Sequence, residues 1–259
     1  MDLLQLVLLA LIQGATEFLP ISSSGHLILT PALLGWDDQG LAFDIAVHLG
    51  SLVAVVVYFK AELLTLLRAA FQPDRKEFKL AWGIMVATVP LGLAGLVFAD
   101  SVATVLRSPA VIAASTAAFG ILLWVADHRR GTRTEQSLRW PDLLAIGMGQ
   151  ALALIPGTSR SGITMTVGLS LGLGREAAGR FAFLLAVPAV AMTAVWQTMQ
   201  FFSDPEPVPW LWLALATSLS ALTAFATIAL FLSLIGRLGM AVFAIYRLVL
   251  AAVIVYVLL

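Results

Sequence analysis

The sequence contains no cysteine and little charge. The lack of cysteine excludes disulfides, a thiol nucleophile and cysteine-ligated metal centres. Charged residues make up 12% of the 259 residues, whereas soluble domains usually carry about 25%. Basic and acidic residues number 15 each, so the net charge gives no indication of a nucleic-acid partner, and we expect none.

Apolar residues dominate instead. They make up 60% of the chain, and the mean hydropathy is +0.97, which indicates a membrane protein that crosses the bilayer several times. A helix needs about 17 to 25 apolar residues to cross a bilayer. Six runs meet this length, at residues 43–59, 80–99, 109–127, 178–199, 209–232 and 239–258.

Two further apolar regions, 2–35 and 141–173, are interrupted by Pro20 and by Pro156-Gly157. Proline ends or kinks a helix, and irregular backbone at membrane depth is tolerated only when protein or a wet cavity surrounds it. We therefore predict two re-entrant hairpins, each made of two short helices.

The distribution of Lys and Arg predicts the orientation, because short cytoplasmic loops are rich in these residues. The loops 60–79 and 128–140 are basic and should be cytoplasmic, whereas the acidic pairs Asp37-Asp38 and Asp204/Glu206 lie in loops without basic residues and should face outward. Six crossings fit these assignments only if the first hairpin enters and leaves from outside and the second from inside.

An internal repeat supports this arrangement. QGATEFLPISSSG begins at Gln13 and QALALIPGTSRSG begins at Gln150, and each segment is followed by three crossings. The sequence therefore predicts an all-α polytopic membrane protein with a single membrane domain over 1–259. Its first inverted repeat would cover 1–130 and its second 139–259, with a site between the broken helices near the midplane.

The stretch from Gln13 to His26 places polar groups inside apolar sequence. A carboxylate at a helix centre in lipid costs roughly 2.5 to 3.5 kcal/mol, so Glu17 is expected to be functional. Gln13 lies four residues earlier, on the same helix face. The serines that follow Pro20 can cap a second helix, whose free N–H groups would bind phosphate.

Residues 156–164, PGTSRSGIT, provide the complementary group. Arg160 carries five N–H donors and needs an anionic partner inside an apolar hairpin. Glu17 alone would give a structural salt bridge, but it would leave the serines unexplained. A phosphate group accounts for both, because a guanidinium binds phosphate oxygens in a bidentate fork.

The motifs QxxxE, FLPISSSGH and PGTSRSGIT, together with the run FDIAVHLGSLVAVVVYF, resemble the BacA/UppP family of undecaprenyl-diphosphate phosphatases. The resemblance implies removal of the terminal phosphate of undecaprenyl diphosphate, which regenerates the lipid carrier for cell-wall synthesis, and an association with bacitracin resistance. It also implies a multi-pass protein of the bacterial plasma membrane, a site that opens to the periplasm, and a divalent cation, Mg²⁺ or Ca²⁺. Polyprenyl diphosphate and membrane lipid would be its partners, and a homodimer is a further assembly that we consider.

The resemblance assigns roles by motif position. Glu17 would act as catalytic acid and metal ligand, Arg160 as phosphate clamp, His26 as general base or acid and Ser23 as nucleophile, although a neighbouring serine or water could attack instead. We interpret His48 as a core histidine and Asp44 as a structural group. The expected substrate-binding residues are Gln13, Ser22, Ser24, Thr158, Ser159, Ser161 and Thr164.

Two other functions fit part of the pattern. Inverted repeats with broken helices also build secondary transporters and flippases, in which the hairpin tips would form an anion site. The type 2 phosphatidic acid phosphatases share an SGH and an SR, but they need a second histidine after the SR, and the run after Arg160 has none. Convergence of an acid, an imidazole, hydroxyls and a guanidinium favours the hydrolase.

Overall fold

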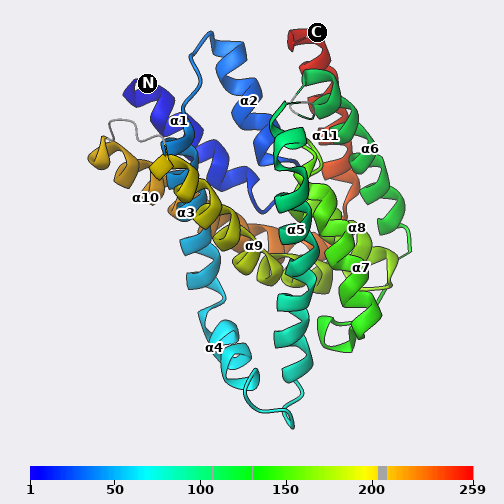
Figure 1. The fold of residues 1–259 in the computed structure, drawn as a ribbon. Helices are drawn as coiled ribbons and strands as arrows, with labels where there is room; N and C mark the ends of the chain where they lie inside the picture. Colours follow the sequence, from blue (N-terminus) through cyan, green and yellow to red (C-terminus); the bar gives the residue numbers. More distant parts are fainter. Residues whose placement is uncertain (105, 107, 130, 204–208, 259) are drawn as a thin grey trace.

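The structure, a computed structural model, describes residues 1–104, 106, 108–129, 131–203 and 209–258. The predicted orientation also depends on three residues outside this set, namely Arg130, Asp204 and Glu206. Within it the chain is all-helical, without a named strand (Figure 1).

Six helices are long and apolar enough to cross a membrane, which confirms the six predicted crossings. Their ends lie within about four residues of the predicted ones, except where α5 and α10 run further at their C-terminal ends. They are α3 (Leu41–Tyr58), α5 (Phe78–Thr104), α6 (Pro109–Asp127), α9 (Arg175–Ser203), α10 (Trp210–Leu238) and α11 (Ala241–Leu258). A short helix, α4 (Lys60–Ala69), lies in the basic loop after α3, and a 3-10 turn, η1 (Glu135–Ser137), precedes α7.

Two helix pairs occupy the regions broken by proline. They are α1 (Leu3–Thr16) with α2 (Ser23–Leu34), and α7 (Trp140–Ala151), extended by the 3-10 turn η2 (Leu152–Leu154), with α8 (Arg160–Ser170). The outer ends of each pair meet. The Gln5 side chain donates to the Asp37 carbonyl at 3.0 Å, and Arg133 exchanges backbone hydrogen bonds with Gly172 and Gly174. A re-entrant hairpin needs its two ends on one side of the membrane, and these contacts are consistent with that prediction.

The second helix of each pair begins in the same way. Ser22 and Ser159 are the N-caps, with φ of 72° and 66°, and their hydroxyls accept hydrogen bonds from the N–H groups of Gly25 and Gly162. No other non-glycine residue in the described part of the chain has a positive φ. This shared, strained geometry supports the predicted internal repeat.

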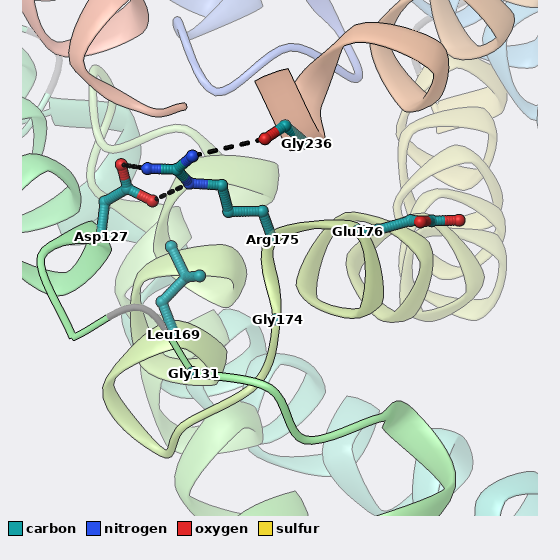
Figure 2. Close-up of a pocket in the computed structure, with 7 residues that line it drawn as sticks. All are labelled: Asp127, Gly131, Leu169, Gly174, Arg175, Glu176 and Gly236. Atoms are coloured by element: carbon teal, nitrogen blue, oxygen red, sulfur yellow. Dashed lines mark hydrogen bonds and ion pairs between the residues drawn. The ribbon is translucent and has the colours of Figure 1, made fainter. Parts of the chain in front are cut away.

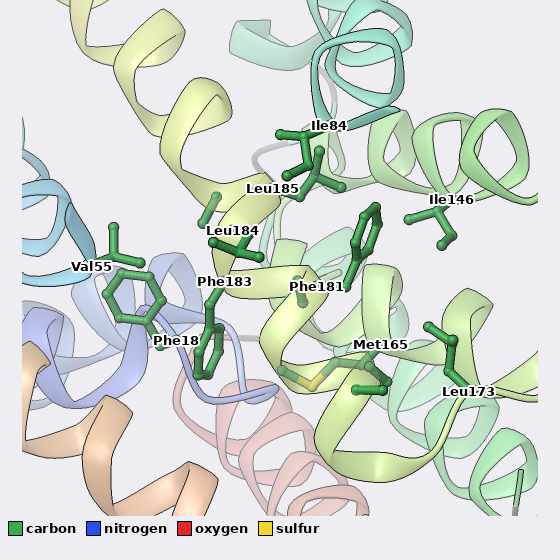
Figure 3. Packing of buried hydrophobic residues seen from close by; sticks show 14 of the residues in the cluster. Phe18, Val55, Ile84, Ile146, Met165, Leu173, Phe181, Phe183, Leu184 and Leu185 are labelled. Atoms are coloured by element: carbon green, nitrogen blue, oxygen red, sulfur yellow. The ribbon is translucent and has the colours of Figure 1, made fainter. Parts of the chain in front are cut away.

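Apolar packing fixes the tip of the first hairpin against α9. Phe18 is fully buried, and its ring meets that of Phe183 edge to face at a centroid distance of 5.3 Å. Figure 3 shows these rings in one cluster with Leu184, Leu185 and Met165. Residues 17–22 are thus held by packing, although they form no helix.

Small residues, among them Gly50 and Ser51, allow α10 to approach α3 closely. A Cβ atom at Gly50 would lie 2.3 Å from the Thr217 carbonyl oxygen. The Ser51 and Ser220 hydroxyls are 3.2 Å apart, and Ser220 also donates to the Val47 carbonyl at 2.7 Å.

We expect Gly50→Ala to lower the free energy of unfolding by about 1–3 kcal/mol, because the added methyl group would push two helix backbones apart. Thermal unfolding in detergent measures the change. Gly95→Ala in α5 is the matched control, since a Cβ there meets nothing within 4 Å. Equal melting temperatures for the two variants would show that α3 and α10 do not pack as described.

Candidate active site

The tips of the two hairpins meet at an ion pair. Arg160 Nη2 donates to Glu17 Oε1 at 2.7 Å, and the side chains are only 15% and 8% exposed. A second hydrogen bond crosses between the tips, from the Ser161 hydroxyl to the Leu19 carbonyl at 2.9 Å. The two motifs therefore form one site.

Glu17 is the centre of the polar contacts. Its Oε2 accepts hydrogen bonds from the Ser23 hydroxyl at 2.7 Å and from Gln13 Nε2 at 2.9 Å. His48 Nε2 lies 3.9 Å from the same oxygen. Hydrogen bonds that stabilise the charged form keep a buried carboxylate ionised, so Glu17 is held as an oriented anion beside a hydroxyl.

Local sequence explains both tips. Glu17 is the C-cap of α1, and Ser23 and Arg160 are the first residues of α2 and α8. Gly157 has φ of +91°, and a Cβ there would lie 2.3 Å from the Ser115 hydroxyl oxygen. Only glycine fits this turn, which α6 holds through a hydrogen bond from Ser115 to the Pro156 carbonyl at 2.5 Å.

A cavity of about 530 Å³ opens at the tips, a size typical of small-molecule sites. The predicted residues Glu17, Ser22, Ser23, Ser24, Ser159 and Arg160 line it. The rest of the wall mixes polar side chains with apolar ones, which include Leu27, Ile28, Leu91, Leu154 and Val190. The cavity thus combines polar groups with apolar side chains on which a hydrocarbon chain can lie.

Five predicted residues do not line this cavity. Gln13 reaches it only through its hydrogen bond to Glu17. Ser161 holds the Leu19 carbonyl, Thr158 is fully buried, and the Thr164 hydroxyl donates to carbonyls within α8. These four residues lie outside the cavity lining and support the hairpin tips. The fifth, His26, is turned away from them.

His26 lies against α11. Its Nδ1 is 2.7 Å from the Ser22 carbonyl oxygen and its Nε2 is 2.6 Å from the Tyr246 hydroxyl. A carbonyl only accepts, so Nδ1 must carry the proton and Nε2 accepts from Tyr246. The structure therefore places Glu17, rather than His26, in contact with the Ser23 hydroxyl.

Two residues that the sequence treated as structural line the cavity, namely His48 and Asp44. His48 Nδ1 donates to the Asp44 carbonyl at 2.7 Å, which leaves Nε2 facing Glu17. The spacing of four residues was the available signal, since it places both polar side chains on one face of an apolar helix.

The cavity walls offer oxygen atoms to a divalent cation. Glu17, Asp38 and Asp44 line the cavity, whereas Arg160 is the only arginine or lysine among its lining residues. No group of three acidic or histidine side chains that could hold a metal occurs among the residues described. The described side chains alone would thus supply too few ligands, but a carboxylate with diphosphate oxygens and water suits Mg²⁺.

A second cavity, of about 490 Å³, shares no lining residue with the first. Figure 2 shows its main feature, a two-fold ion pair in which Arg175 donates to both oxygens of Asp127, at 2.6 and 2.8 Å. Asp127 also accepts from the Met240 N–H at 3.0 Å. This pair joins the end of α6 to the start of α9 and to the residue before α11. Because its charges satisfy each other, we interpret it as structural.

Known proteins match the chain over nearly its whole length. Undecaprenyl-diphosphatase 2 of Stutzerimonas stutzeri is 51% identical, with 98% of this chain and 97% of that protein covered. Undecaprenyl-diphosphatase of Nitrosococcus oceani is 50% identical, with 99% of each covered. The family described as "Bacitracin resistance protein BacA" matches residues 6–253. The chain therefore belongs to the BacA family.

Proposed function

We propose that this protein hydrolyses undecaprenyl diphosphate to undecaprenyl phosphate and inorganic phosphate. The observation that carries the proposal is the contact of Ser23, Glu17 and Arg160 across two hairpins, in a cavity whose wall also includes apolar side chains. A lipid diphosphate has the matching shape, with a charged head and a hydrocarbon tail. Two relatives that are 51% and 50% identical to this chain in sequence are named undecaprenyl-diphosphatases.

Arg160 would hold the terminal phosphate. Its Nη1 donates to the Ala186 carbonyl at 3.0 Å and its Nη2 to Glu17, which fixes the plane of the guanidinium. The remaining N–H groups can donate to phosphate oxygens. A preorganised donor of this kind stabilises the charge that develops during phosphoryl transfer.

Ser23 would attack the terminal phosphorus. Its hydroxyl already donates to Glu17, which would take the proton as the new P–O bond forms. The bond from phosphorus to the bridging oxygen would break and release undecaprenyl phosphate. Water would then hydrolyse the phosphoserine, release inorganic phosphate and restore the hydroxyl.

His26 would act through the backbone. Its Nδ1–H donates to the Ser22 carbonyl, next to the nucleophile. We propose that this bond orients the first turn of α2, and thus the Ser23 hydroxyl, because a residue held by a second hydrogen bond loses rotational freedom.

A divalent cation, Mg²⁺ or Ca²⁺, would be held by Glu17 together with diphosphate oxygens and water. Bound there, it would neutralise phosphate charge that the carboxylates lining the cavity would otherwise repel. The protein would reside in the plasma membrane with this cavity open to the periplasm, an orientation that the basic loops 60–79 and 128–140 support.

Phosphate release from undecaprenyl diphosphate by detergent-purified protein tests the function. The wild type should turn over with Mg²⁺, and Ser23→Ala should be at least about 10³-fold slower. Ser218→Ala, a change to an exposed serine on α10, is the control and should keep the wild-type rate. If the wild-type protein shows no turnover, the result would favour a transporter. If Ser23→Ala is fully active, the nucleophile would be water and not Ser23.

A further inference from the structure

Arg247 is a fully buried arginine in the middle of the membrane-crossing helix α11. Its three nitrogens donate to three backbone carbonyls: Nε to Thr116 at 3.0 Å, Nη2 to Gly157 at 2.9 Å and Nη1 to Pro20 at 3.3 Å. The ion pairs among the described residues leave it without a carboxylate partner.

Two of these carbonyls belong to the hairpin breaks, and the third, that of Thr116, lies in α6. Pro20 lies in the break between α1 and α2, and Gly157 lies in the break between α7 and α8. Arg247 therefore joins the two tips through one rigid, planar group. Its Nη1 also lies against the first turn of α8, where a Cβ at Gly162 would be 2.9 Å away.

The charge of Arg247 is only partly compensated. Burial of a cation without a counter-ion is costly, and the N-terminal end of α8 adds positive potential from the helix dipole. An anion bound at the tips would compensate both. Because the cavity lining contains three carboxylates and one guanidinium, a second fixed positive charge beside the tips favours phosphate binding.

We propose that Arg247 is a positioning residue of the phosphate site, which locks the two hairpin tips together and supplies a fixed positive charge behind them. The inference rests on the proposed function. It concerns a residue that does not line the cavity and that would not touch the substrate.

Two variants separate the charge from the hydrogen bonds. Arg247→Lys keeps the charge and loses the planar fork, whereas Arg247→Gln keeps amide donors and loses the charge. We would measure the affinity of purified protein for inorganic pyrophosphate, at a fixed Mg²⁺ concentration, together with the melting temperature. Arg247→Gln should bind pyrophosphate at least about tenfold more weakly, and Arg247→Lys should stay within about threefold of the wild type, since charges interact strongly at low dielectric.

Asp127→Asn is the matched structural control, because it breaks another buried contact of α6 at the separate cavity of Figure 2. It should lower the melting temperature and leave pyrophosphate affinity unchanged. Wild-type pyrophosphate affinity in Arg247→Gln would overturn the inference. Wild-type protein that neither binds pyrophosphate nor releases phosphate would instead overturn the proposed function.

If neither Arg247 variant yields folded protein, Gly120→Ala makes the same test. A Cβ at Gly120 would lie 3.0 Å from Arg247 Cβ and 3.3 Å from its Nε, so the methyl group shifts the guanidinium without changing its charge. Turnover at saturating substrate should fall severalfold, and an unchanged rate would overturn the inference.

Discussion

Glu17→Gln is expected to slow phosphate release by at least about 10³-fold, while the protein still inserts into the membrane. The amide keeps the shape of the carboxylate, but it cannot accept the Ser23 proton. In the wild type, the Ser23 hydroxyl donates that proton to Glu17 in a hydrogen bond of 2.7 Å. Release of inorganic phosphate from undecaprenyl diphosphate measures the loss.

The same change should also reduce stability, by roughly 3–5 kcal/mol, because it leaves the buried Arg160 without its counter-ion. Adding Arg160→Met to Glu17→Gln removes the unpaired charge, so the double variant should regain stability without regaining activity. Recovery of both together would mean that Glu17 acts only as a structural partner. Glu62→Gln is the control, since the Glu62–Arg180 pair is about one-third exposed and such pairs contribute about 0–1 kcal/mol.

Much of this site could be predicted from the sequence because polar groups inside apolar runs are costly and therefore informative. Glu17 and Arg160 were found in this way, and the structure brings them into contact. Pro20 and Pro156 indicated where each hairpin breaks. The serines after Pro20 were expected to cap the next helix, and Ser22 does so, as Ser159 does in the second pair.

The direction of each side chain depended on distant partners instead. His26 is close to Ser23 in sequence, but its ring stacks on Tyr246, at a centroid distance of 5.6 Å, and faces α11. Conversely, His48 faces the cavity because α3 packs its small residues, Gly50 and Ser51, against α10. The local sequence places His48 on one helix face with Asp44, but it does not say which part of the chain either histidine contacts.

Arg247 was not predicted from the sequence, for a different reason. It stands alone in the last apolar run, so the criterion that identified Glu17 applies equally to it. Pairing acidic with basic residues in the sequence does not reveal its position, because its partners are three backbone carbonyls from separate parts of the chain. Every residue has a backbone carbonyl, so the amino-acid type does not show which carbonyls will accept a hydrogen bond.

Arg160→Ala is expected to reduce turnover by about 10³- to 10⁵-fold, the range lost when an arginine that stabilises a transferring phosphoryl group is removed. Arg160→Lys should recover only part of the rate. A lysine provides a point charge without the planar fork, and in this site Nη1 and Nη2 are directed to two different partners, the Ala186 carbonyl and Glu17.

Added guanidinium ion distinguishes a missing group from a damaged fold. It should restore phosphate release to Arg160→Ala, because the substitution leaves a guanidinium-sized space beside Glu17, and it should not restore Glu17→Gln. Arg180→Lys, a change to the arginine paired with Glu62, should keep near-wild-type turnover. If Arg160→Lys matched the wild type, a simple positive charge would suffice, and the orientation imposed by Ala186 and Glu17 would have no part in catalysis.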